Sequence, residues 1–186
     1  MISKETMAIV ATFGLAALPA PSLAAPGNEA TASGNASAEV IAPLTFEAVA
    51  PLEFGTLAVS PSDSGSISVD PAGGAPVYTG SLRAACSAAA LCDASPARFA
   101  VRGQPGRYYR IEYPDQTYAS PVSSSAPALL VKQITVATDN LSSQGARGQL
   151  SAEGADGFRV GGTLEVPGGT AAGRYRATLN IVVSYD

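Results

Sequence analysis

The stretch RYRATLNIVVSYD, residues 174–186, alternates apolar and polar side chains almost without interruption. A period of two residues predicts a β-strand with one buried face, because successive side chains of a strand point to opposite sides. This strand is a core strand of the domain, and the alternative is that it also serves as a surface for assembly with another chain. The side chains of the candidate assembly strand are Tyr175, Leu179, Ile181, Val183 and Tyr185, with Ala177 on the same face.

Shorter stretches with the same alternation occur through the rest of the chain, separated by Gly, Pro, Ser and Asp. LLVKQITVA (129–137) and FRVGGTLEV (158–166) are the clearest of them. ARFAVRGQPGRYYRIEYPD (97–115) predicts a hairpin whose three-residue loop is QPG (104–106), with Gly106 able to adopt a positive φ. About eight to ten short strands and no convincing helix are typical of an all-β sandwich.

The beginning of the chain has the features of a secretory signal peptide. A mostly apolar run from Met7 to Leu18 is followed by small residues, and Ser22-Leu23-Ala24 fits a cleavage site. We expect residues 1–24 to be removed, which leaves no membrane span, and the protein to be exported to the periplasm, the cell surface or the medium. Residues 25–37 are then a flexible N-terminal extension or a donor strand, and residues 38–186 form the sandwich domain. The donor-strand alternative follows from small residues at every second position between Ala30 and Val40.

Two cysteines, Cys86 and Cys92, lie in the exported part. An oxidising compartment favours a disulfide between them. If they pair, CSAAALC is a loop, because in a straight helix their separation exceeds what a disulfide spans. The alternative is two free thiols in an Ala-rich helix.

The composition excludes several kinds of chemistry. The chain contains no His, which rules out a Ser-His-Asp triad, a Cys-His dyad and an imidazole metal site. It also lacks a phosphate-binding glycine motif, and its net charge of −4 argues against nucleic acid. We therefore expect a protein that is not an enzyme and that uses no cofactor or metal.

Tyrosines and arginines are concentrated in residues 98–118. Aromatic faces and guanidinium groups suit acidic glycans, and the candidate ligand patch consists of Arg98, Arg102, Tyr108 and Arg110. The alternative is that the tyrosines belong to the core and the arginines to solvated strand faces.

Four segments together resemble a bacterial family, domain of unknown function 4402. They are PLEFGTL (51–57), SISVDPAGG (66–74), FAVRGQPGRYYRIEYP (99–114) and VGGTLEVPGGTAAGRYRATLNIVVSYD (160–186). That family looks distantly similar to spore-coat-protein-U-like subunits and to fimbrial subunits assembled by the chaperone and usher route. The resemblance implies an immunoglobulin-like (pilin-like) antiparallel β-sandwich that lacks one strand, which the N-terminal extension of the next subunit completes.

The resemblance also gives two parts of the chain a role. Tyr185 stands where those subunits carry a penultimate aromatic residue, and residues 30–40 stand where they carry the donor extension. The chain departs from them in its alanine-rich extension, which offers little apolar area, and in the short cysteine loop.

Two functions remain open. The first is an exported structural or cell-surface protein, fimbria-like or coat-like, whose partners are copies of itself or a periplasmic chaperone. The second is a secreted monomeric binding module for acidic glycans or another surface ligand.

Overall fold

The computed structural model describes residues 32–86, 94–141 and 145–186, and within these ranges every regular element is a β-strand. The strands pair antiparallel throughout, which confirms the predicted all-β sandwich class. Contacts divide the chain into two units, Met1–Glu39 and Val40–Asp186. Of the first unit, residues 32–39 are described, and they form no strand. The described residues contain no helix that could span a membrane.

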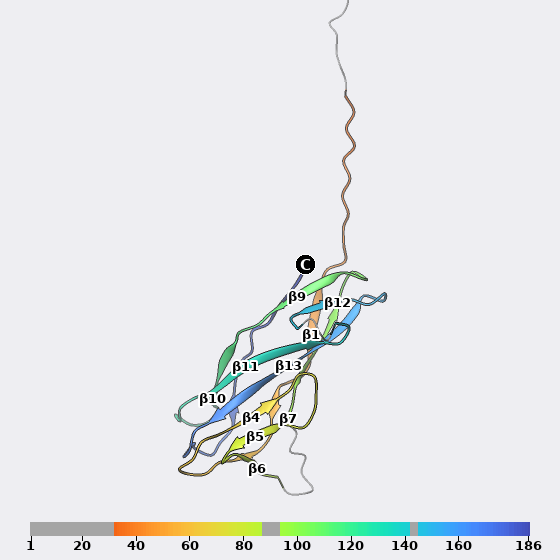
Figure 1. The fold of residues 1–186 in the computed structure, drawn as a ribbon. Coiled ribbons are helices and arrows are strands. Elements are labelled where there is room, and N and C mark those ends of the chain that lie inside the picture. The colour runs from red at the N-terminus through yellow and green to blue at the C-terminus, as the bar shows by residue number, and fades with distance from the viewer. Residues whose placement is uncertain (1–31, 87–93, 142–144) are drawn as a thin grey trace, which may run out of the picture. The chain divides into compact units, whose positions relative to one another are not determined.

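The strands of the second unit are short, apart from two long ones near the centre of the larger sheet (Figure 1). Their bounds are β1 (Thr45–Ala50), β2 (Glu53–Phe54), β3 (Leu57–Ala58), β4 (Gly65–Val69), β5 (Val77–Gly80), β6 (Arg83–Ala84), β7 (Ala94–Ser95), β8 (Ala97–Arg102), β9 (Tyr108–Glu112), β10 (Gln116–Pro121), β11 (Leu129–Thr138), β12 (Arg147–Gln149), β13 (Ala155–Val166), β14 (Tyr175–Arg176) and β15 (Val182–Tyr185).

β13 is the central strand of the domain. One of its edges pairs with β8 along its first half and with β4 along its second half, and its other edge pairs with β11. The resulting 8-stranded sheet has the order β1-β8-β13-β11-β10-β14, with β4 paired to β13 and β5 paired to β4. The predicted strands at 129–137 and 158–166 are therefore confirmed as β11 and β13, and they lie side by side.

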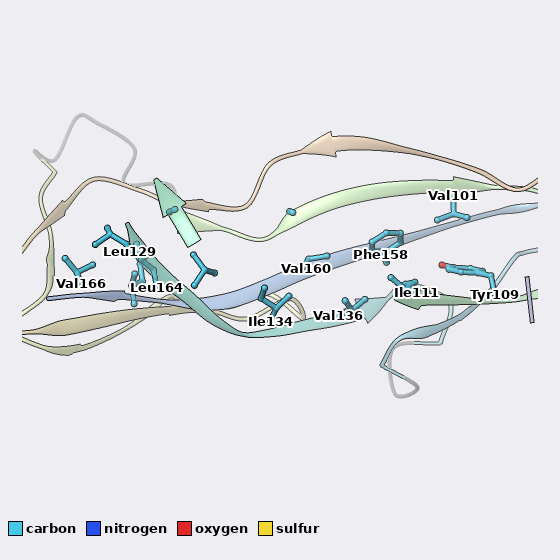
Figure 2. Packing of buried hydrophobic residues seen from close by; sticks show 14 of the residues in the cluster. Val101, Tyr109, Ile111, Leu129, Ile134, Val136, Phe158, Val160, Leu164 and Val166 are labelled. Carbon is cyan, nitrogen blue, oxygen red and sulfur yellow. The ribbon is translucent and has the colours of Figure 1, made fainter. Parts of the chain in front are cut away.

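A second, 3-stranded sheet has the order β12-β9-β15 and covers part of the larger one. The core lies between them, as Figure 2 shows for Tyr109 and Ile111 of β9, which lie beside Phe158 and Val136. The rings of Phe99 and Phe158 stack at 4.7 Å within the larger sheet. Removing these side chains from water supplies the main driving force for folding.

β11 contains an irregularity in the middle of the larger sheet. Gln133 has a φ of 51°, and its register with β13 shifts between Lys132 and Thr135. An extra residue on one strand is a β-bulge, which bends the strand and increases its twist. The side chain of Lys132 stays on the solvent side, where it pairs with Glu165.

The predicted hairpin at 97–115 is wrong. β8 pairs with β1 and β13, whereas β9 pairs with β12 and β15, so the two strands belong to different sheets. The loop between them crosses from one layer to the other, and Gly106 has the expected positive φ of 73°. Its backbone N–H donates to carbonyl groups of Leu150 and Ser151 rather than closing a hairpin.

The cysteine loop lies between β6 and β7. Cys86 is described and exposed, whereas Cys92 lies outside the described residues. The disulfide therefore stays a prediction. The signal peptide, residues 1–24, also lies outside the described residues.

Candidate functional site

The C-terminal segment, residues 174–186, follows an edge of both sheets. β14 pairs with β10 at the end of the larger sheet, and β15 pairs with β9 at the end of the smaller one. Within the described ranges, neither β14 nor β15 has a strand on its other side. The backbone groups along that side are thus open to pairing with another chain.

The expectation of one unbroken strand is wrong in its middle. Residues 177–181 form no ladder, although the hydroxyl of Thr117 donates to the carbonyl of Thr178 at 3.1 Å. The segment of the same chain that faces this break runs through Pro114, between β9 and β10. Proline has no N–H to donate, and it therefore interrupts the pairing of the segment beside it.

The alternation of the segment is nevertheless that of a strand with one inward face. All five side chains of the candidate assembly strand pack against the core, namely Tyr175, Leu179, Ile181, Val183 and Tyr185. Each remains only partly buried, and Ala177 is exposed. The segment is therefore a half-covered edge and not a strand in the middle of the core.

A second row of apolar side chains along residues 44–59 has the same half-buried character. Its members pack against the core without being enclosed by it, and they are Leu44, Leu52, Phe54, Leu57 and Val59. β1 follows Leu44 and ends the larger sheet opposite to β14. The segments at both edges of the larger sheet, 44–59 and 174–186, therefore carry apolar side chains that are only partly buried.

Tyr185 links the C-terminal segment to the chain just before β1 and to the loop after β8. Its hydroxyl accepts a hydrogen bond from the backbone N–H of Gln104 at 2.7 Å and donates one to the carbonyl of Ala42 at 2.9 Å. Gly103 lies directly under this hydroxyl, with no room for a Cβ. The sequence indicated Tyr185 as a position of interest but gave no sign of its partners, which lie far away in the chain.

The proposed donor extension forms no strand in the part that the structure describes. Residues 32–40 form no strand, and each of them is exposed. Val40 is 94% exposed. The first part of the extension, residues 25–31, lies outside the described residues.

The structure does not bring the four residues of the candidate ligand patch together. Arg98 and Arg102 lie on β8 of the larger sheet, while Tyr108 and Arg110 lie on β9 of the smaller sheet. In each strand the neighbouring residues point into the core, so the two pairs lie on outer faces of different layers.

On β9 these residues have local partners. The guanidinium of Arg147 lies 4.6 Å from the ring centroid of Tyr108 and pairs with Asp186 at 2.7 Å. Arg110 lies 4.0 Å from Glu112. Contacts of this kind are typical of a solvated strand face.

Sequence reasoning missed a buried polar contact between the layers. Tyr109 is fully buried, and its hydroxyl donates to Oδ2 of Asp156 at 2.9 Å. Burial, followed by this hydrogen bond, raises the pKa of Tyr109 well above its usual range. The contact fixes β9 against β13, which is a structural role.

Metal binding has no support in the described residues, among which no group of three His, Cys, Asp or Glu side chains could hold an ion.

The comparisons with known proteins give one match. The family model described as "Domain of unknown function (DUF4402)" matches residues 44–185, from just before β1 to the end of β15. No curated protein and no solved structure matches the chain. The match includes both edge segments and the central strand, and the chain therefore belongs to the family of domain of unknown function 4402.

Proposed function

We propose that this protein is an exported, non-enzymatic structural subunit of the cell surface, fimbria-like or coat-like, that assembles through its open C-terminal edge. The observation that carries the proposal is the half-buried row from Tyr175 to Tyr185, which lies on strands with no neighbour on one side among the described residues. A strand added there would pair with the free backbone groups and cover this apolar row.

The occupant that fits this edge is residues 30–40 of another copy. The described part of this segment, 32–40, is exposed and forms no strand, so it is accessible for pairing along an edge. Its alternating alanines add little apolar area, and the added strand would be held mainly by backbone hydrogen bonds. Small side chains suit an edge whose own residues already cover part of the core.

We further propose that the sandwich is immunoglobulin-like and related in architecture to fimbrial and spore-coat-U-like subunits. Its support is the placement of the first and last segments of the domain at sheet ends, joined through Tyr185 and Ala42. A subunit of this kind is exported by its signal peptide, and a periplasmic chaperone would occupy the open edge until assembly.

The test uses site-directed crosslinking between two populations of the full chain that carry different tags. One population carries Ala36→Cys in the extension and the other carries Asn180→Cys, an exposed position in the unpaired part of the C-terminal segment. After mixing and mild oxidation, we expect a disulfide between the two tags, and a ladder of species for the unmodified protein in size-exclusion chromatography.

The matched control replaces Asn180→Cys by Glu153→Cys, which is also exposed but lies in the turn before β13. It should give no enrichment of the mixed species. Deletion of residues 25–39 should abolish the ladder. A monodisperse monomer that this deletion leaves unchanged would overturn the proposal.

The second candidate function, a secreted monomeric module for acidic glycans, is favoured by one observation. Arg98 forms no ion pair or side-chain hydrogen bond with the described residues, and it lines a concavity on the outer face of the larger sheet.

A further inference from the structure

Two arginines lie directly opposite each other on the outer face of the larger sheet. Arg98 of β8 is the register partner of Arg159 of β13. Their chain neighbours Phe99 and Phe158 point into the core and stack there, so both guanidinium groups project to the other side. Like charges directly opposite in a sheet are destabilising, and an anion beside this pair would offset the repulsion.

Within the described residues, the two guanidinium groups are only partly neutralised. Nη2 of Arg159 lies 3.3 Å from Oδ1 of Asp139, and Nη1 donates to the carbonyl of Ala72 at 3.2 Å. Nε of Arg159 is buried, and the part of the chain that the structure describes offers it no acceptor. Arg98 has no partner among the described residues. One full positive charge and one buried donor are thus left unsatisfied, and a buried donor without an acceptor costs stability.

The same side chains line a shallow concavity. Two adjoining hollows, of about 410 Å³ and about 530 Å³, share Arg98, Asp139 and Arg159 as lining residues. Gly157 forms part of the floor, and a Cβ there would overlap the carboxylate of Asp139. The glycine therefore allows Asp139 to lie against the sheet beside Arg159.

The chemistry of the lining selects a ligand. Arg98 and Arg159 line the concavity together with Asp139 and Asp156, and the Asp156 carboxylate already accepts from Tyr109, Asn140 and Gly157. The lining has no excess positive charge, which suits a singly charged oxyanion better than a phosphate. A carboxylate can accept from Arg98 and, after a small rotation of the side chain, from Nε of Arg159. Oδ2 of Asp139 and the free amide oxygen of Asn140 can accept from hydroxyl groups, because Asn140 uses its Nδ2 on the carbonyls of Gln149 and Ala155.

We propose that this concavity binds one acidic sugar unit, with its carboxylate between Arg98 and Arg159 and its hydroxyls toward Asp139 and Asn140. The inference is independent of assembly, because the concavity lies on the outer face of the larger sheet and does not use the C-terminal edge. The proposed site shares Arg98 with the candidate ligand patch. Its other residues are Arg159 of β13 and Asp139 and Asn140 of the turn after β11.

The experiment is a titration of the ¹⁵N-labelled full chain with sodium glucuronate, followed by NMR. Glucose and sodium acetate serve as probes that carry only the hydroxyls or only the carboxylate. We expect glucuronate to shift the backbone signals of Arg98, Asn140 and Gly157, and to bind about tenfold more tightly than either probe, since each probe loses one set of contacts.

Arg98→Gln should weaken glucuronate binding about tenfold. Arg102→Gln is the matched control, because Arg102 lies on the same face of the same strand but does not line the concavity. The affinity of this variant for glucuronate should stay within about twofold of the wild type. Asp139→Asn should tighten acetate binding about threefold, because it removes the competing carboxylate.

Three results would overturn the inference: no shift of these signals by glucuronate, equal affinity for glucose and glucuronate, or an unchanged affinity of Arg98→Gln. A weaker affinity of Asp139→Asn for acetate would also contradict it. None of these results bears on the crosslinking test of assembly.

Discussion

The hydroxyl of Tyr109 donates to Oδ2 of Asp156 at 2.9 Å, and this hydrogen bond joins a strand of the smaller sheet to the central strand of the larger one. Asp156 also accepts the backbone N–H groups of Asn140 and Gly157 through Oδ1, at 3.1 Å and 2.8 Å. One carboxylate thereby orders the start of β13, the turn after β11 and the ring of Tyr109.

The raised pKa of Tyr109 makes stability depend on pH in the alkaline range. In the unfolded chain tyrosine ionises near pH 10, whereas the buried hydroxyl keeps its proton above that pH. The unfolded state then binds fewer protons than the folded state, so the free energy of unfolding falls as pH rises above 10, by up to about 1.4 kcal/mol per pH unit from this group. Urea unfolding at several pH values between 9 and 11 measures the slope.

Tyr109→Phe should show a shallower slope over the same range and, at pH 7, a free energy of unfolding lower by about 1 to 3 kcal/mol, because Asp156 loses a partner. An identical slope in the variant and the wild type would contradict the assigned role of Tyr109.

Gly148→Ala should destabilise the protein because Gly148 is the register partner of Tyr109, and a Cβ there would overlap the buried ring. We expect the free energy of unfolding to fall by about 1 to 3 kcal/mol, the usual range for overpacking. Gly173→Ala is the control, since no atom lies within 4 Å of its added Cβ. Thermal unfolding followed by circular dichroism compares them, and equal melting temperatures would argue against the close packing of β12 on β9.

Tyr185→Phe removes a hydroxyl that both accepts from Gln104 and donates to Ala42. The expected loss of stability is about 1 to 2 kcal/mol, one net hydrogen-bond contribution for each contact. Tyr118, which is 58% exposed, provides the matched control, and Tyr118→Phe should leave the urea midpoint unchanged. If the two variants unfold at the same urea concentration, the bridge through Tyr185 adds nothing.

Gln133→Val should lower the free energy of unfolding by about 1 to 2 kcal/mol, because a β-branched residue is poorly accommodated at a φ of 51°. Gln133→Gly should be tolerated or stabilising, because glycine adopts this φ without strain. A valine variant as stable as the glycine variant would show that the bulge in β11 is not maintained.

The alternation of apolar and polar residues predicted which side chains of β8, β9, β11 and β13 face the core, because that pattern depends only on the period of a strand. It could not predict pairing. A hairpin and a crossing between two layers place Val101 and Tyr109 toward the same core, and Gly106 suits either loop.

The C-terminal segment and the arginine concavity illustrate the same limit. The alternation predicts the inward face of residues 174–186, but the break at 177–181 depends on Pro114, which lies in the connection between β9 and β10. Arg98 belongs to a cluster of arginines and tyrosines that is visible in the sequence, whereas Arg159 and Asp139 come beside it only through the register of β8, β13 and β11.

The bond between Tyr185 and Ala42 has a mechanical consequence for any filament built from this domain. Tension applied across these two positions would load a single hydroxyl first and then peel β15 from β9 one residue pair at a time, instead of shearing all pairs together. A strand inserted from a neighbouring molecule along the same edge would carry that tension in shear, so the joint between subunits would resist pulling better than the isolated subunit does.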